Sequence, residues 1–349
     1  ESVSRFSNGV PAGQGVVWKM RQSYRRVFVA AAAAVLLAFS AIDLLPQSPR
    51  SARLGWLWAK SEKRTSAGGY LPPPWHFEGR AIYQLYPVKV QTAEKYIPKE
   101  LNIVQLGGYT LGGWYLANYT DSPACDKPKF GELVAIAGLV WNPPSSCAWA
   151  SHVYVGSKSA KIHGEKEVGL PENLGRFELR QPERKPGLLG RLFPPRPEVT
   201  LTCKGREVIS MAVPKEREGW RAGVPVTMNM PSFSGYTRNK PGLLNYWLEL
   251  KARISLVSPS CKTRVPEASP LKELLSNRPM ICLDFEKLRM DVEPPKKFNP
   301  LKTFENVPFP FLQARRRDGI EEEERSRNRG GFLSSLLRRR EPPVPEPAA

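Results

Sequence analysis

Apolar residues concentrate in two long runs near the middle of the chain. The first, Tyr109–Tyr119, is rich in aromatic residues and contains the pair Gly112 and Gly113; the second, Glu132–Trp141, is apolar after its first residue. A polar turn separates them. Apolar runs of this length, bounded by turn residues, are typical of buried strands. We therefore expect two central strands, with a bend or a close backbone approach at the glycine pair.

Shorter patterns of period two predict more strands on either side of these runs. Lys204–Gly205 separates two apolar segments and predicts a hairpin. A short helix is expected at 92–101, because Thr92 can cap it and Pro98 stops it. Repeated strands with few helices indicate a mainly β (α+β) fold, an antiparallel barrel or sandwich. The expected additional strands are 81–90, 149–155, 197–203, 206–212 and 246–256.

Composition divides the chain into three parts: 1–69, 70–312 and 313–349. The first part carries ten Lys and Arg against three acids, and its start is Ser- and Arg-containing, as in an organelle transit peptide. The last part contains four consecutive glutamates, an Arg-rich stretch and a Pro-rich end, which predict a charged disordered tail. Only 70–312 is expected to form a packed domain.

A twin arginine, Arg25–Arg26, precedes an apolar run at 27–45. This order resembles a twin-arginine export signal, and behind a transit-like segment it resembles the two-part signals that direct proteins to the thylakoid. The alternative is a membrane anchor that is retained in the thylakoid or envelope membrane. The sequence therefore predicts a chloroplast protein, in the thylakoid lumen or at the thylakoid membrane.

The net charge of +19 raises the question of a nucleic-acid partner. No RNP, helix-turn-helix or zinc-finger pattern is present, so we expect no nucleic acid and assign the charge to a solvated surface or to attraction for anionic lipid. The five cysteines are scattered, and the three histidines, His76, His152 and His163, are not paired at ligand spacing. We expect no metal site and no cofactor.

Several short motifs recur in one order along the proposed domain. They resemble the acetoacetate decarboxylase superfamily, and this resemblance implies a closed or nearly closed, cone-like antiparallel β-barrel with a buried apolar site. Longer phrases, from about Pro72 to Asp284, resemble the plant neoxanthin-deficient family, which implies a role in forming the xanthophyll neoxanthin. The short motifs are Phe77–Arg80, Ile97–Leu101, Asp121–Pro123, Gly131–Glu132 and Gly164-x-x-Glu167-x-x-x-Pro171-x-x-Leu174-Gly175.

The chain departs from the decarboxylase pattern at one decisive place. True decarboxylases carry two adjacent lysines after the motif proline, and the first forms a Schiff base. Here Pro171 is followed by Glu172 and Asn173, which cannot form an imine. Lys166 lies nearby, but an ion pair with Glu167 would keep its amine protonated. The resemblance therefore implies a site without Schiff-base chemistry.

The candidate site comes from the positions that match the family's site. Arg80 and Glu132 match its substrate-binding arginine and active-site glutamate, and Glu172 replaces a lysine. Glu132 and Glu172 could act as an acid and a base if burial raised one pKa, whereas the structural alternative is an ion pair or charges at strand ends. Further residues are expected to line a long apolar cavity suited to a carotenoid, or else to fill an ordinary core. They are Trp114, Trp141, Trp149, Asn173 and Tyr236.

Three functions remain open on this basis. The first is a plastid protein that binds a xanthophyll or its precursor and is required for neoxanthin formation. The second is an isomerase that converts violaxanthin to neoxanthin. The third is a structural or assembly protein of the thylakoid.

Overall fold

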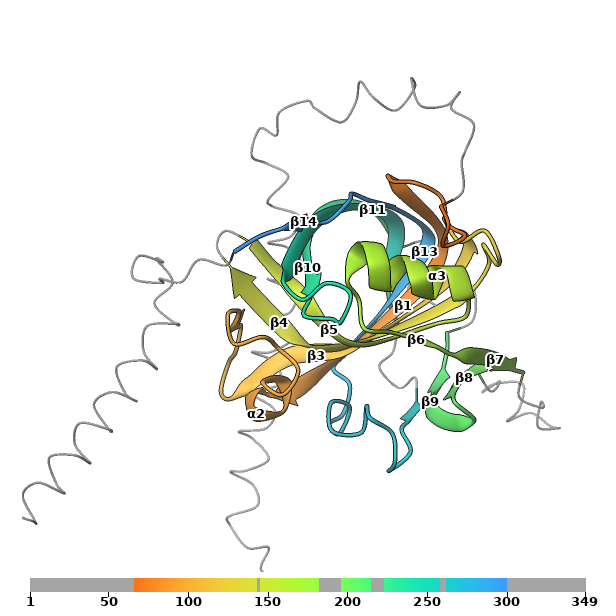
Figure 1. Cartoon of the computed structure of the whole chain (residues 1–349). Coiled ribbons are helices and arrows are strands. Elements are labelled where there is room, and N and C mark those ends of the chain that lie inside the picture. The colour runs from red at the N-terminus through yellow and green to blue at the C-terminus, as the bar shows by residue number, and fades with distance from the viewer. Residues whose placement is uncertain (1–65, 143–144, 182–195, 215–222, 258–261, 300–349) are drawn as a thin grey trace, which may run out of the picture. The chain divides into compact units, whose positions relative to one another are not determined.

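The computed structural model describes residues 66–142, 145–181, 196–214, 223–257 and 262–299 (Figure 1). This part of the chain is mainly β with a few short helices, as the sequence predicts. The predicted targeting segment, except for its last four residues, and the predicted charged tail lie outside the described residues. No helix within the described ranges is long and apolar enough to cross a bilayer.

A strongly coiled sheet forms most of the fold (Figure 1). Its main path is β10-β11-β13-β1-β3-β4-β5-β6, with β14 attached to β11 and β2 to β4. The two central runs predicted from the sequence form β3 and β4, which pair with each other. The strands are β1 (Trp75–Lys89), β2 (Asn102–Ile103), β3 (Tyr109–Asp121), β4 (Gly131–Asn142), β5 (Ser145–Val155), β6 (Glu172–Leu174), β10 (Val224–Gly235), β11 (Leu243–Val257), β13 (Ile281–Val292) and β14 (Lys296–Lys297).

The closed antiparallel barrel expected from the resemblance is not confirmed. Among the described strands, the hydrogen-bonded path ends at β10 and at β6 and does not return on itself. One of its pairings, β5 with β6, is parallel. Strand β10 nevertheless runs close to β5 without a shared ladder. The sheet is therefore coiled but open in its hydrogen bonding.

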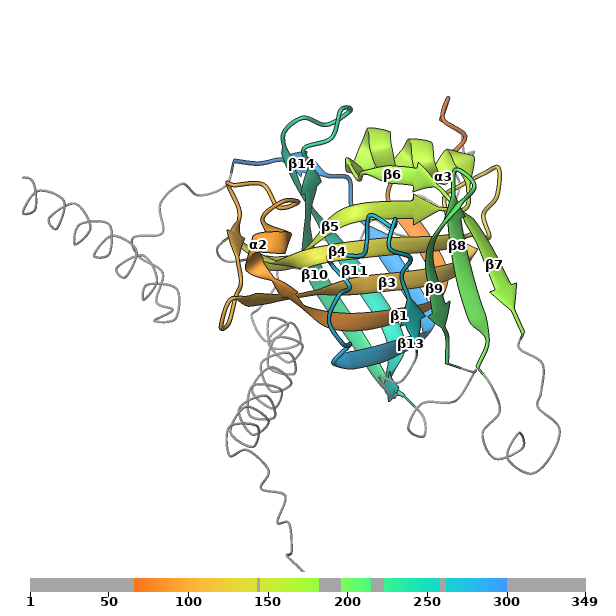
Figure 2. The ribbon, with the colours of Figure 1, turned by 90° about the horizontal axis from the view of Figure 1, so that it is seen from below.

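A second, small sheet packs beside the large one (Figure 2). Its order is β12-β9-β8-β7, from β7 (Arg176–Arg180), β8 (Glu198–Cys203), β9 (Arg206–Ala212) and β12 (Thr263–Arg264). The predicted hairpin is confirmed, because β8 and β9 pair across Lys204 and Gly205, which both have positive φ. This conformation is the one that a two-residue hairpin turn needs.

The large sheet buries both of its faces. Its outer face packs Trp114 and Leu133 with Leu201 and Ile209 of the small sheet, in one apolar cluster. Its inner face holds a second cluster that includes residues of β1, β3, β4, β5, β10, β11 and β13. Since side chains fill the inner face, the interior is a packed core with room for only a limited cavity.

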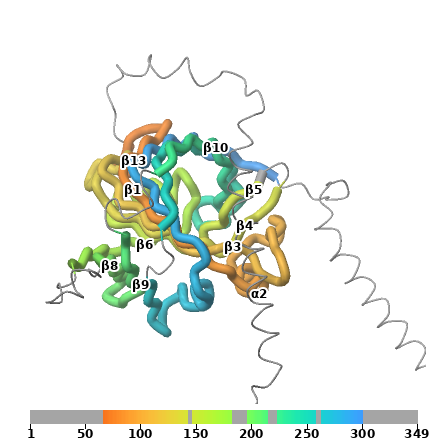
Figure 3. The backbone as a smooth tube through the Cα atoms, turned by 180° about the vertical axis from the view of Figure 1, so that it is seen from behind, coloured from red at the N-terminus to blue at the C-terminus, as the bar shows by residue number. Residues whose placement is uncertain are grey.

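Helical structure is limited to short segments. Helix α2 (Val90–Ala93) is much shorter than the helix expected at 92–101, because the chain turns after it and Pro98 follows. Figure 3 shows α2 on the same side of the large sheet as β8 and β9. Helix α3 (Lys158–His163) continues into a π-helical turn, η2 (Gly164–Val168), and the sequence patterns did not predict either.

Candidate functional site

A cavity of about 90 Å³ lies between α3–η2 and the inner face of the large sheet. Its walls are mostly apolar, and five of its lining side chains can take part in hydrogen bonding. No lysine or arginine lines it among the described residues. The lining residues are Phe77, Tyr119, Phe130, Glu132, Val155, Ala160, His163, Gly164, Val168, Leu170, Glu172, Tyr246, Leu248, Met290 and Val292.

Glu132 reaches the cavity from the start of β4. It pairs across the strands with Ala117, so its side chain shares the inner face with Ala117 and Tyr119. The Tyr119 hydroxyl donates a hydrogen bond of 2.6 Å to Glu132 Oε2. Burial raises the pKa of Glu132 above its ordinary value, and the bond from Tyr119 opposes that rise. The carboxyl is thus fixed in orientation and holds a proton more readily than an exposed glutamate.

Glu172 enters the cavity from β6, which is held by its parallel pairing with β5. The residue is 7% exposed. Its Oε2 atom has no hydrogen-bond partner among the described residues. Burial, together with the negative charges of Glu132 and Glu165, raises the pKa of Glu172 well above its ordinary value, although Lys161 acts in the opposite direction. Glu172 therefore holds its proton more readily than an exposed glutamate does.

Gly164 makes the position of Glu172 possible. A Cβ atom at Gly164 would fall on the carboxyl group of Glu172. The glycine of the Gly-x-x-Glu motif thus leaves the space that this carboxyl occupies. The motif's own acid, Glu167, accepts a 2.6 Å bond from the Tyr70 hydroxyl, and Lys166 is exposed to solvent.

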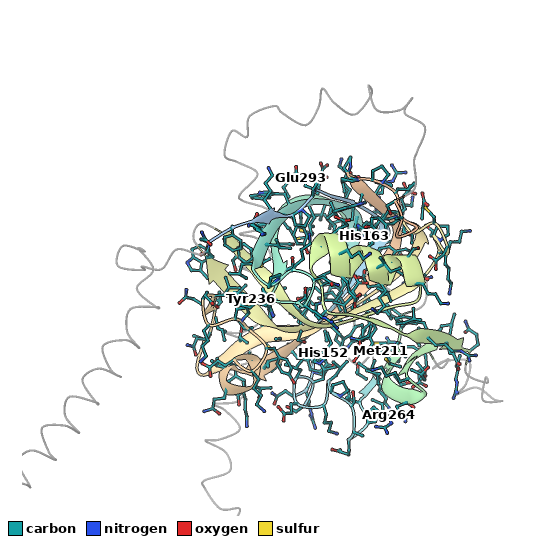
Figure 4. The ribbon with its side chains drawn as sticks, viewed as in Figure 1. His152, His163, Met211, Tyr236, Arg264 and Glu293 are labelled. Atoms are coloured by element: carbon teal, nitrogen blue, oxygen red, sulfur yellow. The ribbon has the colours of Figure 1, made fainter. Side chains whose placement is uncertain are left out.

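His163 closes the cavity from the end of α3 (Figure 4). Its ring packs edge-on against Trp75, with 4.4 Å between the ring centroids. The residue is 5% exposed, and burial lowers the pKa of the imidazole to about 4. Its Nε2 atom has no hydrogen-bond partner within the described ranges. The ring is therefore neutral at pH 7 and offers one unused nitrogen.

These groups together can transfer protons. A carboxyl with a raised pKa, a second carboxyl held by a tyrosine and a neutral imidazole line one largely apolar cavity. Titratable groups with shifted pKa values that cluster in a cavity are typical of acid–base sites. Among the described residues the lining offers no amine for an imine, so the geometry supports proton transfer and hydrogen bonding, and it does not support Schiff-base chemistry.

Arg80, the third residue expected in the site, lies elsewhere. It pairs with Asn118 on β3, whose side chain points to the face opposite Ala117 and Glu132. Its guanidinium binds Asp284 through two bonds, Nε–Oδ1 at 2.9 Å and a second nitrogen to Oδ2 at 2.5 Å. Arg80 is therefore part of an ion pair, which is the structural alternative for this residue, and it does not line this cavity.

The other expected ligand residues also lie outside this cavity. Trp114 and Trp149 belong to the outer-face cluster, and Trp141 lies at the end of β4. Asn173 donates from its side chain to the Pro171 carbonyl, at 3.3 Å. Tyr236 is 48% exposed, well apart from His163 in Figure 4. Of the expected site residues, only Glu132 and Glu172 share the cavity.

Sequence reasoning missed His163 and the role of Tyr119. Both left some signal in the sequence. His163 directly precedes Gly164 of the recognised motif, and Tyr119 alternates along β3 with Tyr115 and Ala117. Neither signal says that helix α3 folds across the sheet, because the sequence patterns did not predict that helix.

The fold shows the class of protein to which this chain is similar. An acetoacetate decarboxylase from Legionella pneumophila superposes with a TM-score of 0.50 and 11% identity, covering 74% of this chain and 100% of that structure. A likeness at this identity shows the fold, which is acetoacetate decarboxylase-like. No protein-family model matches the chain.

The sequence relatives are more specific. Protein NEOXANTHIN-DEFICIENT 1 of Arabidopsis thaliana is 38% identical over 282 residues, which span 69% of this chain and 99% of that protein. The protein of the same name from Solanum lycopersicum is 36% identical, over 65% of this chain and 92% of its own length. That from Oryza sativa subsp. japonica is also 36% identical, over 67% of this chain and 92% of its length. The chain belongs to the NEOXANTHIN-DEFICIENT 1 family.

Proposed function

We propose that this chain acts in neoxanthin biosynthesis and binds a xanthophyll, or a xanthophyll precursor, at the cavity between α3–η2 and the large sheet. Family membership supports the pathway, since the relatives are named for neoxanthin deficiency. The observation that carries the proposed site is the presence of Glu132 and Glu172 in one mostly apolar cavity. This combination suits an apolar molecule that carries oxygen at one end.

The size of the cavity limits how such a ligand binds. Its volume of about 90 Å³ is smaller than the roughly 150 Å³ of a cavity known to hold benzene, and far below the roughly 300–1,000 Å³ of typical ligand pockets. A whole xanthophyll is several times larger than benzene. We infer that only its oxygenated end approaches the carboxyls, and that the rest lies across the partly buried apolar residues of the rim, Phe77, Leu170, Leu248 and Met290.

Turnover is the second candidate function. Converting violaxanthin to neoxanthin opens an epoxide and removes a proton from carbon to form an allene, so it needs an acid and a base and no redox partner. Protonated Glu172 would give its proton to the epoxide oxygen, and Glu132 would take the proton from carbon. The specific observation that favours this candidate is the environment of each carboxyl. Glu172 has an unpartnered oxygen, and Glu132 is held by Tyr119.

Decarboxylation through a Schiff base is not part of the proposal. A covalent adduct needs an unprotonated amine beside the substrate. Among the described residues no lysine lines the cavity, and Lys166, the nearest in the motif, is exposed. Borohydride trapping with a keto acid tests this point, because a stable adduct on the protein would contradict it.

Incubation of the purified full chain with violaxanthin in detergent separates the candidates. Pigment that co-purifies with the protein without a new product supports binding alone, and neoxanthin detected by chromatography supports turnover. If the protein is an isomerase, Glu132→Gln should abolish turnover; if it only binds pigment, Glu132→Gln should leave binding close to that of the wild type. Glu273→Gln, an exposed glutamate outside the cavity, is the control. If the protein neither binds pigment nor forms product, the proposal is contradicted and a structural or assembly role is favoured.

The location that we propose is the plastid, at or inside the thylakoid. The support is compositional: a Ser- and Arg-containing start, the pair Arg25–Arg26 and the apolar run 27–45, all outside the described residues. Import of the labelled chain into isolated chloroplasts, followed by N-terminal sequencing, tests it. Uptake with removal of the run supports a processed signal, uptake with retention supports a membrane anchor, and failure of import contradicts the location.

A further inference from the structure

Two buried polar atoms of cavity-lining residues lack hydrogen-bond partners among the described residues: His163 Nε2 and Glu172 Oε2. Both residues are more than nine-tenths buried and both line the cavity. A buried polar atom without a partner is destabilising, and native proteins leave few of them. A pair of such atoms in one small space therefore points to a group that both of them can bind.

The charges around these atoms determine what that group can be. The cavity wall carries two carboxyls and, within the described ranges, no cation. The guanidinium that could neutralise an anion, that of Arg80, is bound to Asp284 on the opposite face of the sheet. A carboxylate that entered the cavity would lose its hydration and lie beside Glu132, and the nearby ammonium of Lys161 is outside the lining and already paired with Glu165 at 2.5 Å.

An uncharged oxygen group has no such cost. A hydroxyl can accept a bond from protonated Glu172 and donate one to a neutral imidazole, and an ether or epoxide oxygen can accept from Glu172. Aromatic contacts hold the His163 ring in place. Trp75 and Tyr70 contact its ring, at centroid distances of 4.4 and 5.1 Å, and these contacts restrain the orientation of the imidazole.

We propose that the cavity binds an uncharged oxygen group carried on an apolar ring or chain, with His163 Nε2 and Glu172 Oε2 as its hydrogen-bonding partners, and that it excludes carboxylates. This inference deepens the proposed function by naming the chemical class of ligand, and its biological meaning rests on that function. It assigns to His163 a ligand-binding role.

The test compares two probes of similar shape and different charge on the full chain. Cyclohexanol and cyclohexanecarboxylate are titrated at pH 7, and binding is measured by saturation-transfer NMR. The ring of each probe is expected to lie against the rim at Phe77 and Met290, with its oxygen inside. We expect cyclohexanol to bind and cyclohexanecarboxylate to bind at least about tenfold more weakly, since a buried charge without a partner is costly.

Variants then assign the two contacts. His163→Phe keeps an aromatic ring and should raise the Kd for cyclohexanol about fivefold, the worth of one ordinary hydrogen bond. Glu172→Leu should weaken binding similarly, and Glu172→Gln, which keeps a neutral donor, should restore part of it. His152→Phe is the control for the same substitution, because His152 is a partly buried histidine that lies outside the cavity.

Three results would overturn the inference: no binding of cyclohexanol, equal binding of the carboxylate, or unchanged binding by a folded His163→Phe variant. If that variant does not fold, NMR of the wild-type protein tests the inference instead. Cyclohexanol should then shift the ring resonances of His163 and leave those of His152 unchanged, and unshifted His163 resonances would contradict the inference. The violaxanthin experiment tests the proposed function independently of the two probes. If cyclohexanol binds but violaxanthin is neither bound nor converted, this inference stands and the proposed function is contradicted.

Discussion

At the scale of single residues, the contact of Gly164 with Glu172 is the most demanding in the cavity wall. The backbone of Gly164 is helical, with φ −62°, so alanine is sterically allowed there and would gain up to about 1 kcal/mol of helix propensity. Its methyl group, however, would fall on the buried carboxyl of Glu172. We predict that Gly164→Ala lowers the free energy of unfolding by about 1–3 kcal/mol, measured by denaturant titration.

Gly156→Ala is the control for this prediction. A Cβ atom there would meet its nearest neighbour at an ordinary 3.5 Å, and we expect a change within about 0.5 kcal/mol. A Gly164→Ala protein as stable as the wild type would show that Glu172 does not depend on this space.

The buried imidazole of His163 predicts a pH dependence of stability. Its pKa falls from 6.5 in the unfolded chain to about 4 in the folded protein, so the unfolded chain binds more protons between these values. Stability from this residue is present above pH 6.5 and is lost as the pH falls toward 4. Relative to His163→Phe, the wild type should lose up to about 3 kcal/mol over this range. Parallel pH profiles of the two unfolding free energies would contradict this.

At the scale of elements, the sequence pattern predicted most strands and failed for the helix that carries the site. Strands β3, β4, β8, β9 and β11 follow directly from apolar runs, from alternation or from a two-residue turn. Helix α3 and η2 have no strong periodicity, and Gly164 lies in their middle. Their stability comes from residues distant in the sequence, which local patterns do not reveal.

Asp126, in the loop between β3 and β4, is one of those distant residues. Its carboxylate accepts a 3.0 Å bond from the Lys158 backbone N–H and a 2.6 Å bond from the Ser157 hydroxyl, at the start of α3. Ser157 in turn accepts from the Ala160 backbone N–H, as an N-cap. We predict that Asp126→Ala lowers the free energy of unfolding by about 1–2 kcal/mol.

Chemical denaturation measures this loss. Asp126→Asn, which retains one acceptor oxygen, should recover part of it. Because α3 carries His163, amide exchange in α3 should also become faster in Asp126→Ala, and an unchanged exchange rate would show that this cap does not hold the helix.

At the scale of the whole molecule, two of the three charged residues that the sequence predicts in one site lie in the same cavity. Glu132 and Glu172 reach one cavity although forty residues of sequence separate them. Arg80 does not, because alternation along β1 places it on the face opposite Phe77 and Ala81, which both pack in the inner-face cluster. The alternation is visible in the sequence, but the pairing of β1 with its neighbours decides which face of the strand points inward, and no local pattern reveals that.

The shape of the large sheet depends on a contact that has no shared ladder, between β5 and β10. Side chains must hold this contact. Phe233 of β10 is 2% exposed, stacks on Phe298 with 5.0 Å between ring centroids, and shares an apolar cluster with Cys147 and Trp149 of β5. We predict that Phe233→Ala lowers the free energy of unfolding by about 3–5 kcal/mol, the usual cost of removing a buried phenyl ring.

Denaturant titration measures this cost. Trp247→Ala is the control, since Trp247 is a partly exposed aromatic residue of the neighbouring strand β11. This control substitution should lower the free energy of unfolding by less than about 1 kcal/mol. Hydrogen exchange adds a spatial test. If side chains alone join β5 to β10, exchange in Phe233→Ala should accelerate first along β10 and at the Cys147 end of β5, and the central pair β3–β4 should stay protected. A uniform acceleration would instead mean that this contact and the rest of the sheet unfold as one cooperative unit.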